Sequence, residues 1–534
     1  MTLSILLQVS MFSVEWLKLL LATLPVLSLI ILLGVLKMSG DKSALITLAI
    51  SIIISLTLFG LPPESMALAL VYGTLKAIFP ILIIIIMAIF SYNVLVHTEK
   101  MEILKEQFSS ISSDKSIQVL LLTWGFGGLL EGMAGFGTAV AIPAAILISL
   151  GFKPIFAALT SLIANSVATA FGAVGTPVKV LAEQANIADV QMLSIHVVFQ
   201  LGILMYIIPF VLMFMTDPRI KALPKNVFVS LIVGTVSLLT QYLSARYIGA
   251  ETPAVLGSLA SIAAIIIYAR LKATKEDNEI RAKFPKRSLS DIFKAWSVYG
   301  LILLLIVITS PLLPLKSMFE PIISFALHFD IFDMVKEGMR ENIPVKISLI
   351  DAGFLLFFGS LIGGLIQGAK IGDLFKLLWK VCISQRRTII TVCCLISLSA
   401  VMDFSGMIFT IGQALAFATG ALYPLFAPMI GCLGTFLTGS DTSSNILFGK
   451  LQATIAENPA INSDPSWLSA ANTTGATGGK IISPQSIAVA TSACNQQGRE
   501  GEIMKKAILY ALGYIIIAGL IVYFAPKIFD SILF

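Results

Sequence analysis

The chain reads Gly125-Phe-Gly-Gly-Leu-Leu-Glu-Gly-Met-Ala-Gly-Phe-Gly-Thr138 in the middle of an apolar segment that runs from Ile117 to Leu150. A membrane-spanning helix needs about 20 apolar residues, so this segment is too long for one span and too short for two spans and a turn. Its central glycines weaken a helix. Irregular backbone survives at membrane depth only where protein buries it or where it lines a wet cavity. The segment is therefore predicted to form a broken helix or a re-entrant hairpin.

The composition of the whole chain is that of a membrane protein. Of its 534 residues, 57% are hydrophobic and 12% are charged, whereas a soluble domain carries about 25% charged residues. The mean hydropathy is +0.94. These values exclude a soluble globular domain, a disordered chain and a collagen, and the continuously apolar run Ile81–Phe90 excludes the alternating pattern of a β-barrel. The predicted fold is an all-α polytopic membrane protein, with one membrane domain over residues 1–534 and about 12–14 membrane segments.

Continuous apolar segments give the candidate spans. They are Leu17–Leu36, Ala44–Gly60, Leu68–Leu95, Met192–Met215, Phe228–Tyr247, Pro253–Leu271, Ile292–Leu312, Ser348–Ile366 and Ile503–Phe524. Three further regions are apolar but are interrupted by glycine, proline and polar residues, namely Ile117–Val190, Thr388–Leu422 and Tyr423–Ala490. No basic region with a small-residue cleavage site precedes the first long apolar run, which is therefore interpreted as a retained span and not as a signal peptide.

The charged loops predict the orientation. The net charge is +6, and much of the basic excess lies in Arg270–Arg287 and Lys370–Arg387. Both loops should be cytoplasmic, because cytoplasmic loops carry an excess of Lys and Arg. Two candidate spans separate them, so the acidic loop Pro314–Pro344 should lie outside. This basic excess is attributed to membrane topology and not to nucleic-acid binding.

No metal or cofactor site is expected. The cysteines lie in or beside apolar segments, and are interpreted as free core thiols. The histidines are not spaced as metal ligands, and the chain lacks the sequence H-E-x-x-H.

Two regions of the chain resemble each other. Asn165 precedes Pro177 by 12 residues, and Asn472 precedes Pro484 by the same 12 residues. Paired segments that glycine and proline interrupt are the best sequence indication of a transporter's binding site. The prediction is two inverted repeats with re-entrant hairpins and broken helices. Repeat 1 covers about residues 44–190, with motifs 125–138 and 164–177, and repeat 2 covers about 348–495, with motifs 434–445 and 471–486.

Three motifs resemble those of a known family. Glu131-Gly-Met-Ala-Gly-Phe-Gly-Thr138, Thr438-Gly-Ser-Asp-Thr-Ser-Ser-Asn445 and Gly479-Lys-Ile-Ile-Ser-Pro-Gln-Ser486 are similar to signature stretches of the L-lactate permease family. The resemblance covers nearly the whole chain. It implies uptake of L-lactate, and of glycolate and related 2-hydroxy monocarboxylates, with H⁺ across the bacterial cytoplasmic membrane. It also implies a transporter with two inverted repeats. Asp403 stands where the resemblance implies asparagine.

Two carboxylates are the first candidates for proton coupling. Glu131 lies in an apolar, glycine-rich stretch, where a carboxylate is costly and is by default a functional candidate. Asp441 lies in Gly-Ser-Asp-Thr-Ser-Ser-Asn, between apolar flanks. The structural alternatives are a static hydrogen bond for Glu131 and an extramembrane loop for Asp441. Asp403 is the third candidate, with a place at the edge of the pocket as its alternative.

Lys480 is the candidate ligand for the substrate carboxylate. It is the only cation between Lys450 and Arg499, and it would pair with lactate or, in the empty site, with Asp441. Its alternative is snorkelling to the membrane interface. The full predicted substrate-binding set is Lys480, Gly137, Thr138, Asn165, Ser166, Thr442, Ser443, Ser444, Asn472, Thr473, Ser483 and Gln485. For the asparagines and hydroxyls of this set, the alternative is hydrogen bonding between helices.

Rival functions are weighed on the same residues. A Na⁺-coupled carboxylate transporter fits Asp441 with its hydroxyl neighbours, because hard cations prefer oxygen ligands. A membrane-embedded enzyme would need a nucleophile paired with a base, or a metal site, and neither is found. A channel would more naturally carry one pore motif per subunit of a symmetric oligomer. The expected partners are the substrate, H⁺ and the lipid bilayer, with a homo-oligomer left open.

Overall fold

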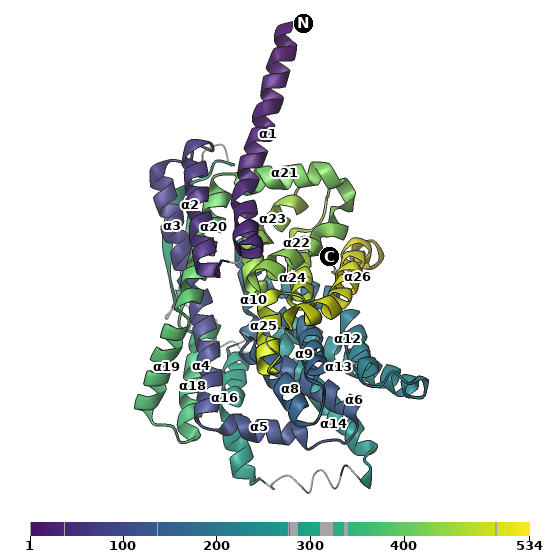
Figure 1. Ribbon diagram of the computed structural model, residues 1–534. Coiled ribbons are helices and arrows are strands. Elements are labelled where there is room, and N and C mark those ends of the chain that lie inside the picture. Colours follow the sequence, from purple (N-terminus) through teal and green to yellow (C-terminus); the bar gives the residue numbers. More distant parts are fainter. Residues whose placement is uncertain are drawn as a thin grey trace.

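The computed structural model describes residues 2–36, 38–135, 137–275, 277, 287–309, 324–335, 340–496 and 499–533. Within these ranges the chain is almost entirely helical, apart from one two-stranded sheet (Figure 1). The helices of the first part of the chain are α1 (Thr2–Ile30), η1 (Ile31–Val35), α2 (Gly40–Thr57), α3 (Pro63–Lys76), η2 (Ala77–Leu82), α4 (Ile83–His97), α5 (Lys100–Ser109), α6 (Lys115–Val119), η3 (Leu120–Gly127), α7 (Gly128–Met133), α8 (Thr138–Ser149), α9 (Pro154–Thr169), α10 (Gly172–Ala185), α11 (Val190–Leu201) and α12 (Leu204–Thr216).

The second part of the chain continues in the same style. Its elements are η4 (Ile220–Ala222), α13 (Leu223–Tyr247), α14 (Pro253–Leu271), α16 (Leu289–Ile308), β1 (Ser324–Phe332), β2 (Arg340–Ser348), α18 (Ala352–Ile366), α19 (Ile371–Ser384), α20 (Arg386–Phe404), α21 (Met407–Thr419), η5 (Gly420–Leu422), α22 (Tyr423–Thr438), α23 (Asp441–Ala456), α24 (Pro465–Lys480), α25 (Pro484–Ala493) and α26 (Glu500–Leu533).

The predicted all-helical membrane class is confirmed. Among the described residues, nine helical segments are long and apolar enough to cross a membrane, or up to eleven if each of two bent pairs is one span. The bent pairs are α9 with α10, at 49°, and α11 with α12, at 41°. Helices α8 and α18 are apolar but shorter, so the predicted 12–14 segments depend on how such short helices are counted. The predicted inverted repeats stay a prediction.

One predicted loop is wrong in its structure. Within Lys370–Arg387 the chain forms α19 over Ile371–Ser384, which runs back from the turn after α18 and leads directly into α20 (Figure 1). The basic residues in this segment are spread among apolar ones such as Phe375 and Trp379, at helical spacing. A prediction from charge density alone therefore missed an amphipathic helix. Most of the other predicted cytoplasmic loop, Arg270–Arg287, lies outside the described residues.

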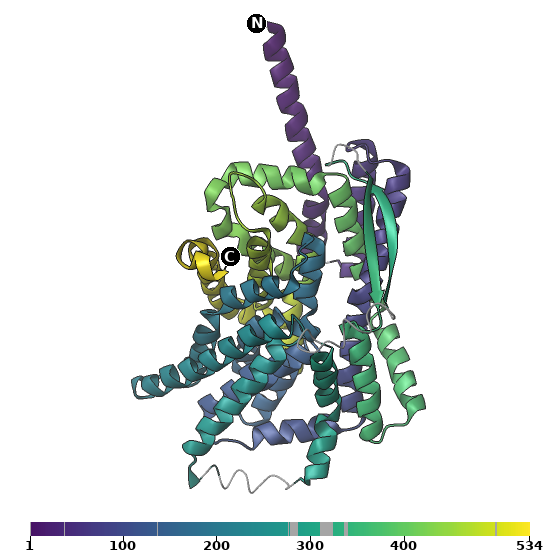
Figure 2. The same cartoon turned by 180° about the vertical axis from the view of Figure 1, so that it is seen from behind.

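A β-hairpin stands in the predicted outer loop, where the charge pattern indicates no strand. Strands β1 and β2 are antiparallel, with Ser324 opposite Ser348 and Phe332 opposite Arg340. Figure 2 shows the hairpin along the outside of the bundle. It packs on α3, where the rings of Phe329 and Tyr72 are 6.0 Å apart. In β2, the apolar residues Ile343, Val345 and Ile347 stand at every second position, which is the period of a half-buried strand, whereas β1 shows no such alternation. Much of the rest of this loop lies outside the described residues.

The helices pack in two groups. The outer group contains α2, α3, α4, α16, α18, α19 and α20 with the hairpin, and the central group contains η3, α7 to α14 and α22 to α26. Helix α1 packs against α2 and α21, and its first half projects beyond the bundle (Figure 1). The outer group meets the central group along α10 and α23. These two helices also adjoin the breaks that the sequence singles out.

Candidate functional site

The glycine-rich segment forms a helical hairpin. Helix α7, which continues η3, ends at Met133, and α8 begins at Thr138 and folds back beside them. At the break Gly135 and Gly137 have φ of +61° and +86°, a conformation that side chains with a Cβ avoid. The Thr138 hydroxyl donates to the Gly135 carbonyl at 2.9 Å. One of the two predicted forms, the hairpin, is thus the one observed, and it puts Glu131 in the last turn before the tip.

A second hairpin repeats this design near the other end of the chain. Helix α22 ends at Thr438 and is followed by Gly439, whose φ is +73°, and α23 begins at Asp441. The Ser440 hydroxyl caps α23 by accepting from the Ser443 backbone N–H at 3.2 Å. The Ser444 hydroxyl donates to the Gly431 carbonyl at 2.8 Å and fastens the two arms together. The polar stretch therefore forms the tip of a helical hairpin.

Each hairpin is followed by an interrupted helix. Helix α9 ends at Thr169 and α10 begins at Gly172, where Ala173 and Val174 have positive φ of 43° and 56°. Such backbone strain costs about 1–3 kcal/mol per residue and is concentrated at functional sites. In the second half of the chain α24 ends at Lys480, and α25 begins after Ser483, whose hydroxyl accepts from the Ser486 N–H at 3.1 Å. Breaks of this kind present free backbone groups to ions and substrates.

An ion pair joins the two halves of the chain at these breaks. Lys480 Nζ donates to Glu131 Oε1 at 2.8 Å, and the two side chains are 12% and 3% exposed. The other carboxylate oxygen of Glu131, Oε2, is buried and has no hydrogen-bonding partner among the described residues. The expected pairing of Lys480 with Asp441 is thus replaced by a pairing with Glu131. The Lys480 side chain is largely enclosed, which does not fit a snorkelling residue.

Asp441 lies beside this pair without joining it. Its side chain is buried, and neither carboxylate oxygen has a hydrogen-bonding partner within the described part of the chain. Both Lys480 and Glu131 are close enough to act on it electrostatically. Buried polar groups normally find partners, so an unpartnered carboxylate in a cavity wall is available to a ligand.

A cavity of about 720 Å³ opens in front of these three residues. From the predicted site it is lined by Glu131, Gly137, Asp441, Thr442, Ser443, Lys480 and Gln485. These residues come from the two hairpin tips and from the break between α24 and α25. The cavity thus brings together the three motifs that the sequence singles out. Among the described residues, no cluster of His, Cys, Asp and Glu could hold a metal ion.

Other predicted ligands do not line this cavity: Thr138, Asn165, Ser166, Ser444, Asn472, Thr473, Ser483 and Asp403. Asn165 Nδ2 donates to the Thr169 hydroxyl at 3.3 Å, within its own helix. The Ser166 hydroxyl donates to the Ile163 carbonyl at 2.7 Å. Asp403 pairs with Lys450 at 3.6 Å, between α20 and α23.

Asn472 and Thr473 belong to a buried hydrogen-bond network. Asn472 Nδ2 donates to Asn445 Oδ1 at 2.9 Å, and Asn445 Nδ2 donates to the Thr473 hydroxyl and, at 3.0 Å, to the Pro177 carbonyl. The network ties the second hairpin to α24 and to the strained start of α10. These hydrogen bonds fit the alternative in which the asparagines link helices, and the role of Asn472 and Thr473 in substrate binding stays a prediction.

One wall of the cavity carries no signal in the sequence. It is formed by Asp41 of α2 and by Arg387, Thr388 and Thr391 of α20. The charge pattern assigns Arg387 to a cytoplasmic loop, and Asp41 precedes an ordinary span. No motif marks either residue, and only the packing of α2 against α20 puts them at the cavity.

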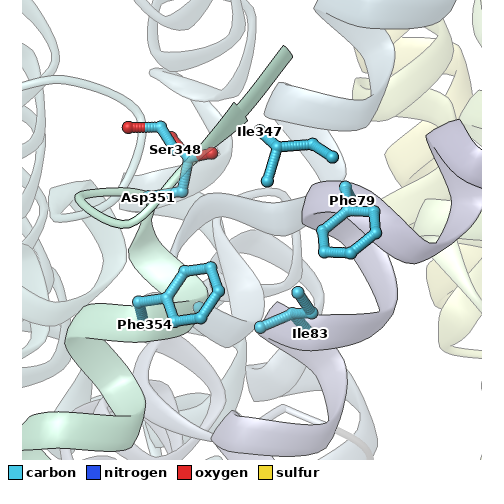
Figure 3. A pocket seen from close by; sticks show the side chains of 7 residues that line it. Phe79, Ile83, Ile347, Ser348, Asp351 and Phe354 are labelled. Atoms are coloured by element: carbon cyan, nitrogen blue, oxygen red, sulfur yellow. The ribbon is translucent and has the colours of Figure 1, made fainter. Parts of the chain in front are cut away.

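A second hollow is too narrow for a substrate. Figure 3 shows Phe79 and Ile83, from η2 and α4, facing Phe354 and Asp351 at the start of α18. The space between them does not admit a water molecule. It carries no binding site for a carboxylate.

Comparison with known proteins gives a second line of evidence, from sequence similarity. A sequence model of the L-lactate permease family matches residues 18–529. An L-lactate permease of Streptococcus iniae is 39% identical, over 84% of this chain and 93% of that protein. The glycolate permease GlcA of Escherichia coli is 34% identical, over 96% of each chain. An L-lactate permease of Halalkalibacterium halodurans is 31% identical, over 95% of this chain and 97% of the relative.

Proposed function

Because the chain belongs to the L-lactate permease family, we propose that it takes up L-lactate, and also glycolate and related 2-hydroxy monocarboxylates, together with H⁺. The protein is a multi-pass protein of the bacterial cytoplasmic membrane. The names of its relatives support lactate and glycolate as substrates. The observation that carries the proposal is the enclosed pair of Glu131 and Lys480 in the wall of the cavity.

This pair explains how anion binding and proton binding are coupled. A lactate carboxylate must be neutralised away from water, because an unpaired buried charge is very costly. Lys480 is the cation in this wall that can neutralise it, but in the empty site Glu131 occupies Lys480. When Glu131 takes up a proton it becomes neutral and releases Lys480 to the substrate. One proton and one lactate then enter together, and the charge of the site is unchanged.

The reverse half of the cycle follows from the same pair. When lactate leaves, Lys480 is left without its counter-ion, and this favours loss of the proton from Glu131 because a nearby positive charge stabilises the ionised carboxyl. The ion pair then re-forms. Loading without a proton, or proton loss without substrate release, leaves one buried charge unpaired. Coupling therefore rests on a cost of charge burial and needs no further device.

Asp441 is suited to recognise the 2-hydroxyl group. Its two buried oxygens accept no hydrogen bond from the described residues, so a substrate O–H donated to them meets an unused acceptor. Thr442, Ser443 and Gln485 line the same wall and can donate to the substrate carboxylate. A site built to bond a hydroxyl rejects an analogue that lacks it far more strongly than an apolar site can. The arrangement thus favours 2-hydroxy acids over simple short-chain acids.

Na⁺ coupling is the alternative, because Asp441 lies beside the hydroxyls of Thr442 and Ser443 and hard cations bind such oxygens. Purified protein in proteoliposomes separates the two. Uptake of labelled lactate should rise with an imposed pH gradient, acidic outside, and should be indifferent to a Na⁺ gradient of the same size. Uptake driven by a Na⁺ gradient at equal pH would show that the coupled ion is Na⁺ and not H⁺. Absence of lactate and glycolate uptake under both gradients would refute the proposed function.

A further inference from the structure

The cavity has a second charged wall that the proposed coupling does not use. One wall, from the hairpin tips and α24, carries Glu131, Lys480 and Asp441. Another part of the lining, from α1, α2 and α20, carries Asp41 and Arg387. Each wall therefore presents a cation together with a carboxylate.

Arg387 lies in the first turn of α20, on the helix face that lines the cavity. The lining residues of that helix are Arg387, Thr388, Thr391, Val392 and Leu395, a spacing that puts them on one helical face. The Thr391 hydroxyl donates to the Arg387 carbonyl at 2.8 Å and the Thr388 hydroxyl donates to Gln385 Oε1 at 3.0 Å. Arg387 is exposed and lines the cavity, and its guanidinium forms no hydrogen bond or ion pair with the described residues.

Asp41 supplies the local counter-charge. It is in the first turn of α2, and Arg387 is close enough to act on it electrostatically, yet no ion pair joins them within the described part of the chain. Asp41 Oδ1 is buried and accepts no hydrogen bond from the described residues. The Arg387 guanidinium therefore lies near the negative charge of Asp41 without forming an ion pair with it. A forked guanidinium of this kind matches the geometry of a carboxylate.

The cavity is much larger than the substrate. It measures about 720 Å³, whereas a single water occupies about 30 Å³ in the liquid, so a three-carbon carboxylate fills only a small part of it. Such a substrate occupies only one part of the cavity at a time. The cavity therefore has room for two anion subsites, one at Lys480 and one at Arg387.

We propose that Arg387 is a second anion subsite, which captures the substrate carboxylate at the α2–α20 wall before or after it occupies Lys480. This inference rests on the proposed function. A cation that faces an aqueous cavity raises the local concentration of anions and makes their capture dependent on ionic strength. Arg387 thereby sets the apparent affinity for substrate, while Glu131 and Lys480 set the coupling to H⁺.

The test compares Arg387→Gln with Arg387→Lys and with the neighbouring Arg386→Gln. Both arginines are exposed and lie in the same helical turn, but of the two only Arg387 lines the cavity. Arg386→Gln therefore removes an equal charge without changing the cavity lining. Lactate uptake in proteoliposomes is measured over a range of lactate concentrations and of ionic strengths. Arg387→Gln should raise KM about tenfold, leave kcat within about twofold and flatten the salt dependence. Arg387→Lys should keep most of the affinity, and Arg386→Gln should match the unmodified protein.

The failures are distinguishable. If the unmodified protein does not transport lactate, the proposed function fails. If it does, and Arg387→Gln matches Arg386→Gln in KM and in salt dependence, the second subsite is refuted. A loss of kcat without a change in KM in Arg387→Gln also refutes it, because the residue would then act on the transport step. If Arg387→Gln does not fold, Arg387→Met, which is uncharged and apolar, replaces it and is judged by the same KM and salt dependence.

Discussion

Glu131 and Lys480 are 349 positions apart in the chain, and their side chains form an enclosed ion pair of 2.8 Å. Glu131 comes from the last turn before the first hairpin tip, and Lys480 is the last residue of the helix before the second break. The pair therefore links the first hairpin to the second interrupted helix. Any movement that separates these two elements must first neutralise or replace one of the two charges.

Removal of the cation should abolish binding of the substrate anion. Lys480→Gln leaves Glu131 without its partner and lactate without a counter-ion, and loss of one member of a buried charge pair costs about 2–5 kcal/mol. Lactate uptake should fall by about a hundredfold or more at unchanged expression. Lys506→Gln is the control, because Lys506 is half exposed and pairs with the surface residue Glu502. Near-normal affinity in Lys480→Gln would place the anion site elsewhere.

Neutralisation of the proton site should separate exchange from accumulation. Glu131→Gln imitates the protonated carboxyl, so Lys480 stays free to bind lactate and lactate–lactate exchange should continue. Net accumulation driven by a pH gradient should be lost, because the empty carrier has no proton to release. Both activities are measured in the same proteoliposome preparation. If Glu131→Gln still accumulates lactate, Asp441→Asn is tested next, and accumulation by both variants would leave Asp403 as the remaining candidate.

A methyl group at Gly172 should displace the Glu131 carboxylate without removing its charge. A Cβ at Gly172 would lie 2.8 Å from Glu131 Oε1, too close for two unbonded atoms, so this oxygen must shift, and its hydrogen bond from Lys480 is disturbed. Misplacement by about 1 Å at a reacting group can cost about a hundredfold in rate, and we expect Gly172→Ala to reduce lactate uptake by about ten- to a hundredfold. Gly300→Ala, whose Cβ would meet no atom within 4 Å, should transport normally. Equal activity of the two variants would contradict the assigned geometry.

Outside the membrane segments, Asp277 should stabilise the fold. It accepts from the backbone N–H of Ser113 and Thr274, each at 2.6 Å, and from their hydroxyls at 2.9 and 2.8 Å. Asp277→Asn puts an amide N–H₂ among these donors, and loss of hydrogen bonds to a charged group costs about 2 kcal/mol or more. The melting temperature in detergent should fall. Asp373→Asn, at an exposed pair, should leave it unchanged.

The same residue predicts a pH dependence. Burial by itself would raise the pKa of Asp277, but the hydrogen bonds from Thr274 and Ser113 outweigh it and hold the pKa below its ordinary value of 3.8. A carboxyl with a lowered folded-state pKa stabilises the fold above its unfolded-state pKa, and this contribution is lost as the pH falls through the folded-state value. The difference in melting temperature between Asp277→Asn and the unmodified protein should be full at neutral pH and shrink below about pH 4. A difference that is independent of pH would contradict this assignment.

The sequence by itself determined the class of the protein and the location of its breaks. Apolar composition leaves a chain of this kind no stable state in water, and the glycines before Thr138 and Asp441 admit the positive φ of a hairpin tip. Both features are local, because hydropathy and backbone freedom are properties of a residue and its neighbours in the chain. The motifs around Glu131, Asp441 and Lys480 are therefore identifiable from the order of the residues alone.

Only the tertiary structure decided which side chains meet. It paired Lys480 with Glu131 in place of Asp441, joined Asn472 and Thr473 in a buried hydrogen-bond network, and brought Asp41 and Arg387 to the cavity. It also formed an amphipathic helix and a β-hairpin where charge had suggested loops. The reason is that hydrogen bonds and ion pairs act over about 3–4 Å, and distances of that size between segments hundreds of residues apart are set by helix packing, which local sequence patterns do not encode.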